Sequence, residues 1–87
     1  MNSKYRWLQL FLMGAPAGVH EITLSFPQLE VITRKALAKA AYRDKNWWSN
    51  NPDDVDNPHT DTWIAIGWRV DAVHFLAAAG SSIRFKK

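Results

Sequence analysis

The chain has 87 residues, of which 47% are hydrophobic and 22% are charged, and this composition excludes a wholly disordered protein. The length suits one domain, residues 1–87, with one core. The absence of cysteine excludes disulfides and thiolate metal sites, and the formal net charge of +3 permits an anionic partner without requiring one.

The small size limits how much of the chain can be buried. A domain of this length buries only about 60 to 65% of the surface that its unfolded chain exposes. The sequence contains five tryptophans, so we expect some large aromatic side chains at the surface.

The N-terminal half is predicted to form a helix, a strand and a second helix. Residues 4–13 carry apolar side chains at helical spacing, and "GAPAG" at 14–18 ends this helix. "HEITLSF" at 20–26 predicts a short strand with Ile22 and Leu24 on one face. Ser25 and Gln28 form a capping-box pattern for the next helix, and Pro27 suits its first turn. The packing face of this helix is predicted to be Phe26, Leu29, Ile32 and Leu37.

The segments from residue 35 onwards are predicted as a short helix, a loop, another helix and a hairpin. "KALAKAAY" at 35–42 has high helix propensity, whereas residues 47–59 offer turn chemistry without an apolar period. A helix within 60–66 would be capped by Asn57 or Thr60 and end at a left-handed Gly67. Residues 68–76 and 81–87 read as strands joined by a turn, and their inward side chains are predicted to be Val70, Ala72, Ile83 and Phe85.

This order of elements predicts an α+β fold in which helices cover one face of a three-stranded antiparallel sheet. A winged-helix fold is the alternative, with the final hairpin as the wing.

The adjacent pair Trp47 and Trp48 stands between a basic and an acidic stretch. Neighbouring side chains diverge on a strand and on a helix, so we expect one of the two rings to face outward. Basic side chains attract phosphates, and indole rings stack on unpaired bases. The candidate nucleic-acid-binding residues are Arg34, Lys35, Lys39, Tyr42, Arg43, Lys45, Trp47, Trp48, Asn50 and His59.

The alternative for the same segment is structural. In that interpretation Trp48 packs in the core, Trp47 covers it, and the cations form a solvated surface. Trp63 and Trp68 are predicted to be core residues, because both lie beside apolar helix or strand positions.

Catalysis has little support in the sequence. There is no Gly-x-Ser-x-Gly motif, no cysteine nucleophile and no phosphate-binding glycine loop, so we expect a non-enzymatic protein without a cofactor. An acidic stretch at 53–61 could hold a divalent cation, but its spacing is not that of an EF-hand, and its carboxylates suit a helix start. Its candidate ligands are Asp53, Asp54, Asp56, His59 and Asp61.

The N-terminus resembles a signal peptide only superficially, because Gln9 interrupts its short apolar run. No stretch reaches the roughly 18 to 20 apolar residues of a membrane-spanning helix. We expect a soluble, cytoplasmic protein.

Four sequence segments resemble a small bacterial and phage domain of unknown function, which sometimes occurs near restriction or HNH nucleases. The resemblance covers residues 5–86 and includes a Trp-Trp-x-Asn segment and a Trp-x4-Trp pattern that ends in Gly-Trp. It departs from the domain at Ala38, where a proline is usual, and in the long acidic loop before His59. The segments are "TLSFPQLE", "AAYRDKNWWSN", "WIAIGWRVDAVHF" and "IRF".

The resemblance implies a role around nucleic acid, with Gly67 and Trp68 as structural residues. The residues that it would place in the site are Tyr42, Arg43, Trp47, Trp48, Asn50 and His59.

Together these observations predict a module that binds nucleic acid, DNA rather than RNA, through a basic segment and an exposed tryptophan. The alternative is a small phage-borne inhibitor that binds a protein of a host defence system, as an anti-CRISPR does. A metal-dependent nuclease is the third hypothesis.

Overall fold

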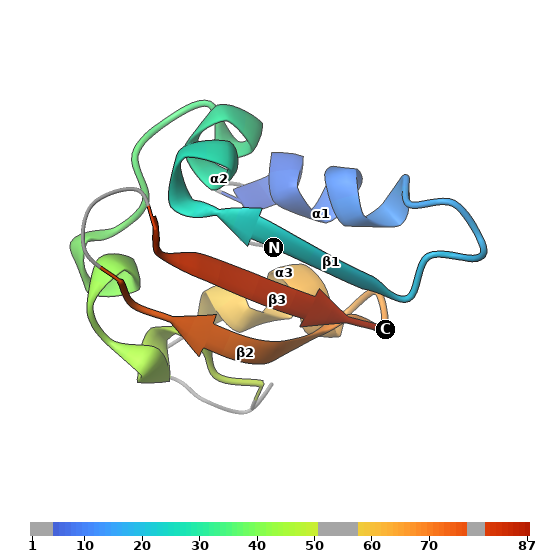
Figure 1. Ribbon diagram of the computed structural model, residues 1–87. Coiled ribbons are helices and arrows are strands. Elements are labelled where there is room, and N and C mark those ends of the chain that lie inside the picture. The colour runs from blue at the N-terminus through green and yellow to red at the C-terminus, as the bar shows by residue number, and fades with distance from the viewer. Residues whose placement is uncertain (1–4, 51–57, 77–79) are drawn as a thin grey trace.

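The computed structural model of the protein describes residues 5–50, 58–76 and 80–87. In these residues an antiparallel sheet of three strands carries helices on one face (Figure 1). The strands are β1 (Glu21–Ser25), β2 (Arg69–His74) and β3 (Ser82–Lys86), in the order β1-β3-β2. The α+β class and the three-stranded sheet are therefore as the sequence predicts.

The helices of the described residues are short. α1 (Arg6–Met13) and α2 (Phe26–Thr33) have eight residues each, and α3 (Asp61–Ile64) has four. α1 packs against both α2 and α3. None of these helices has the length and hydropathy needed to cross a bilayer, as far as the described residues go. The remaining turns are the 3-10 helices η2 (Lys39–Tyr42), η3 (Lys45–Trp48) and η4 (Pro58–Thr60).

α2 begins and ends at defined residues. The Gln28 amide nitrogen donates to Ser25 Oγ at 3.2 Å, and the Ser25 amide nitrogen donates to Gln28 Oε1 at 2.8 Å, which confirms the predicted capping box. The helix ends where Arg34 adopts a left-handed conformation with φ 64°. The helix predicted over 35–42 is reduced to the four residues of η2, because Ala38 before it has an extended backbone with φ -57° and ψ 147°.

The inner face of the sheet forms one side of the core. Leu24, Ile83 and Phe85 are buried there, as predicted, together with Val70. Ala72 was expected to point inward as well, but a β-bulge after Val70 shifts the register by one residue. Ala72 therefore pairs with Arg84, and Val73 takes the inward position opposite Ile83.

α3 and the turn that follows it bring two tryptophans inward. Trp63 and Trp68 are buried as predicted, and Gly67 between them has φ 86°. Thr60 precedes α3 but its side chain makes no capping hydrogen bond, and Asn57 lies outside the described residues. α3 is shorter than predicted, since it ends at Ile64, and the predicted left-handed Gly67 then turns the chain into β2.

The left-handed Gly67 gives a direct test of this turn. A Cβ at position 67 would meet no atom within 4 Å, so Gly67→Ala should act through backbone strain alone. We expect it to lower the free energy of unfolding by about 1 kcal/mol in urea denaturation. Gly18→Ala is the matched control, since its Cβ also meets nothing within 4 Å and its φ is not left-handed. Equal effects of the two substitutions would contradict the described turn.

Candidate functional site

Trp47 and Trp48 both lie in the core, so the prediction that one ring faces outward is wrong. Their exposed fractions are 6% and 2%. They belong to η3, whose first turn is capped where Asp44 Oδ1 accepts from the Asn46 amide nitrogen at 2.9 Å. The two rings converge, with centroids 4.6 Å apart in an edge-to-face arrangement. The long indole side chains allow neighbouring residues of a tight turn to reach one core, although their backbone directions diverge.

Each indole of the pair has its own aromatic surroundings. Trp48 stacks between Phe26 and Trp63, with centroid distances of 6.1 and 5.6 Å, and its Nε1 donates to the Ala41 carbonyl at 2.9 Å. Trp47 stacks on the buried His59 ring at 3.7 Å and meets Tyr5 edge-on. Burial raises the pKa of the Tyr5 phenol above its usual value, and a backbone hydrogen bond at Ala38 opposes this.

Asn50 and His59, also predicted to contact nucleic acid, use their polar atoms within the fold. Asn50 Nδ2 donates to the Val70 carbonyl at 2.7 Å, and its Oδ1 accepts from the Val70 amide nitrogen at 2.7 Å and from Trp63 Nε1 at 3.2 Å. His59 Nε2 is hydrogen-bonded to the Trp47 carbonyl. Asn50 thus ties the end of η3 to the start of β2.

Tyr42, another predicted site residue, joins α2 to the chain that follows it. Its phenol donates to Glu30 Oε2 at 2.6 Å and accepts from the Leu37 amide nitrogen at 2.8 Å. Burial, followed by the hydrogen bond to Glu30, raises the pKa of Tyr42 above its usual value. The phenol therefore stays protonated at neutral pH and holds the Glu30 carboxylate.

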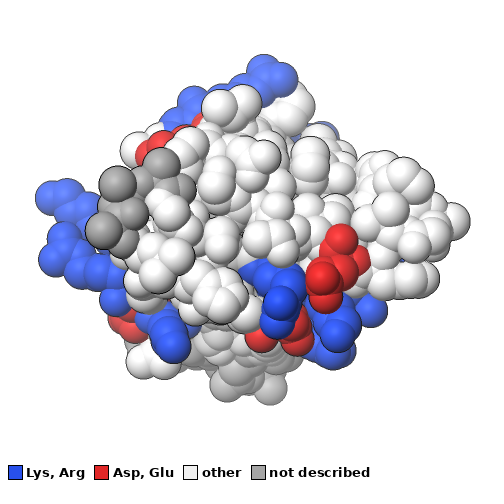
Figure 2. All heavy atoms as spheres, in the orientation of Figure 1, with Lys and Arg blue, Asp and Glu red and all other residues white. Residues whose placement is uncertain are grey.

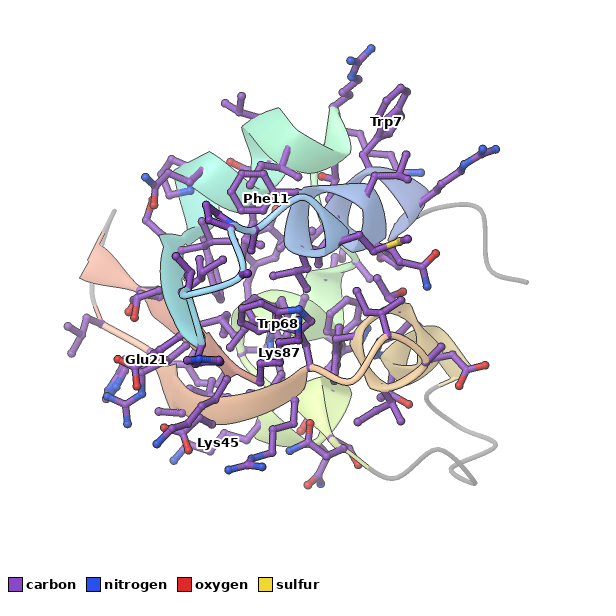
Figure 3. All side chains as sticks on the ribbon, turned by 90° about the vertical axis from the view of Figure 1, so that its right-hand side faces the viewer. Trp7, Phe11, Glu21, Lys45, Trp68 and Lys87 are labelled. Atoms are coloured by element: carbon purple, nitrogen blue, oxygen red, sulfur yellow. The ribbon has the colours of Figure 1, made fainter. Side chains whose placement is uncertain are left out.

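The predicted basic residues are exposed, but they do not gather on one surface. The Arg34 guanidinium carbon lies 3.8 Å from the centroid of the Trp7 ring, and Lys35 Nζ lies 6.0 Å from that of Tyr5. Lys45 lies on the opposite side of the molecule from Trp7 (Figure 3). Figure 2 likewise shows Lys and Arg side chains in separate groups around the edge of one face. The other exposed members of the predicted set are Lys39 and Arg43.

The structure places its exposed aromatic residues on α1, where sequence analysis predicted a helix but no site. Leu8 and Leu12 are buried, whereas Trp7 and Phe11 are 44% and 43% exposed. We call the exposed apolar side chains of the two long helices the α1–α2 surface; they are Trp7, Leu10, Phe11, Met13 and Val31. The sequence signal was the excess of apolar residues on α1, which are too many for one buried face.

A groove lies beside this surface, between α1, β1 and α2. Its volume is about 380 Å³, and five of its six lining residues are apolar. Val31, at 77% exposure, forms part of its outer wall. The lining residues are Phe11, Leu24, Pro27, Gln28, Val31 and Ile32.

The part of the chain that the structure describes contains no group of three or more His, Asp or Glu side chains that could hold a metal ion. Asp53, Asp54 and Asp56 lie outside it, so the acidic-loop hypothesis concerns residues that are not described.

No protein-family model, curated protein or solved structure matches the chain. The resemblance to the small bacterial and phage domain stays a prediction.

The role of Asn50 can be measured as stability. Asn50→Ala would leave the Val70 backbone groups and the Trp63 indole nitrogen without their partner. We expect a loss of about 2 kcal/mol in the free energy of unfolding. Asn46→Ala removes the same side chain from another exposed position four residues earlier and should change stability by less than about 0.5 kcal/mol. Equal stabilities of the two variants would contradict this assignment.

Proposed function

We propose that the protein is a non-enzymatic interaction module whose α1–α2 surface binds a partner protein. The observation that carries this proposal is the apolar character of α1 on both of its sides. Leu8 and Leu12 serve the core, while Trp7, Leu10 and Phe11 follow the i, i+3, i+4 spacing of a second stripe in solvent. A helix that is apolar all round is normally buried, and a contiguous apolar patch is typical of an interaction site.

The residue types of this surface suit a protein interface. Tryptophan is among the commonest anchors of such interfaces, and an aromatic ring buries about 150 to 250 Å² when it is covered. Trp7 and Phe11 are both about half exposed, so a partner can still remove much of their surface from water. The groove next to Phe11 offers space for an apolar side chain of the partner.

Nucleic-acid binding remains a prediction, and one observation favours it. Arg34 and Lys35 lie near the exposed Trp7 and the buried Tyr5, which joins positive charge to an aromatic ring. Against it, the aliphatic side chains of Leu10 and Val31 have no π-face on which a base could stack. Lys45 also lies on the far side of the molecule. These features favour a protein partner, and an inhibitor of a host defence protein would act through such a surface.

The test compares two exposed aliphatic positions. Val31→Asp places a charge at the groove, and Leu76→Asp places one at an equally accessible position outside it, since the two are 77% and 63% exposed. Tagged protein would be purified with its bound molecules from cells that express it. We expect wild type and the Leu76 variant to retain a stoichiometric protein through nuclease treatment, and the Val31 variant to lose it.

Each other outcome is informative. Retention of the partner by Val31→Asp would overturn the assignment of the surface. Release of all bound material by nuclease would instead establish nucleic acid as the ligand. Both variants should unfold at the wild-type urea concentration, because neither side chain is buried.

A further inference from the structure

We infer that the α1–α2 surface binds a short amphipathic helix whose polar positions are acidic. This inference rests on the proposed function, since it names the chemistry of the partner at the same surface. It follows from the size of the surface, from the state of the Arg34 side chain and from the charges around α1 and α2.

The size of the surface favours a short segment over a second copy of the chain. α1 and α2 have eight residues each, so each helix is only about 12 Å long at 1.5 Å per residue. Two such helices side by side present a strip only about 12 Å long, whereas a stable dimer of globular proteins buries roughly 800 Å² per partner. Two to three turns of a helix match this length.

The two helices run in opposite directions, which sets the orientation of the groove. Arg34, after the end of α2, lies on Trp7 near the start of α1. Phe11, near the end of α1, lines the groove with Pro27 from the first turn of α2. A third helix can therefore lie along the pair, as amphipathic helices do in hydrophobic grooves. Its apolar residues would meet Phe11 and Val31 at one end, and its polar residues would reach Arg34 at the other.

Arg34 is prepared to bind a carboxylate. One face of its guanidinium covers the Trp7 ring at 3.8 Å, and a stacked guanidinium keeps its N–H donors at its edge. Within the described residues, one ion pair is formed, between Arg84 and Asp71. No carboxylate of these residues lies within ion-pair distance of Arg34. The contact with the Trp7 indole restricts the guanidinium of the exposed Arg34 side chain. A partner's Asp or Glu can bind in a bidentate manner with little loss of side-chain entropy.

The charged residues at the Trp7 end of the surface are cations. Arg6 is on α1, and Arg34 and Lys35 directly follow α2, all of them exposed. α1 contains no acidic residue, and the one carboxylate of α2, Glu30, binds the Tyr42 phenol. Glu21 lies well away from Trp7 in Figure 3. An acidic residue of a bound segment is therefore attracted to the Trp7 end of the surface, and a basic one is repelled there.

Two synthetic peptides test this inference. Both are 16-residue fluorescein-labelled helices with leucine at positions i, i+3, i+4 and i+7; their polar positions are glutamate in one and lysine in the other. We expect fluorescence anisotropy to show binding of the glutamate peptide at least about tenfold tighter than that of the lysine peptide. Arg34→Gln should weaken the glutamate peptide about five- to tenfold.

The matched control is Lys45→Gln, which removes the same charge far from Trp7 and should change the affinity less than about twofold. If the two substitutions weakened binding equally, the preference for the glutamate peptide would come from the overall charge of the protein, and the inference would be overturned. Equal or tighter binding of the lysine peptide would overturn the acidic partner, and so would no binding of either peptide. In these cases the proposed function is still decided separately by the partner recovered with wild type and lost with Val31→Asp.

Discussion

The structure depends on the stacking of Trp48 between Phe26 and Trp63, closed by its indole hydrogen bond to Ala41. This contact joins α2, η3 and α3 across the inner face of the sheet. Trp47, Trp63 and Trp68 are buried around it. Each such side chain buries about 150 to 250 Å² of surface. Four of the five indoles thus fill a core that 87 residues can only just enclose. The fifth, Trp7, is left at the surface.

This division of the aromatic residues separates the residues that form the core from the surface proposed to bind a partner. Asn50 and His59 hold the core together, because their polar groups bind Val70, Trp63 and Trp47. The α1–α2 surface, by contrast, keeps its apolar side chains and the Arg34 guanidinium available to another molecule. Binding there can proceed without rearranging the core, since Leu8 and Leu12 hold α1 from the opposite side.

Local patterns in the sequence were enough to predict most of the fold. The capping box at Ser25, the left-handed Gly67 and the strand alternation at Leu24 and Ile83 depend on nearby residues, and all were identified correctly. Ala72 was misplaced because a β-bulge is set by strand pairing. The size limit also correctly indicated an exposed aromatic residue. Which aromatic residue is exposed depends on the way in which large side chains pack into one core. The backbone directions of the adjacent residues Trp47 and Trp48 do not contain this information.

The most direct test of this account is the solvent accessibility of each indole in the folded protein. NMR spectra with a soluble paramagnetic agent, together with Trp→Phe variants for assignment, would measure it for all five rings. We predict that the signals removed by Trp7→Phe are the most strongly broadened, and that those of Trp47 and Trp48 are protected. Protected Trp7 signals beside broadened Trp47 or Trp48 signals would contradict the packing described and, with it, the proposed surface.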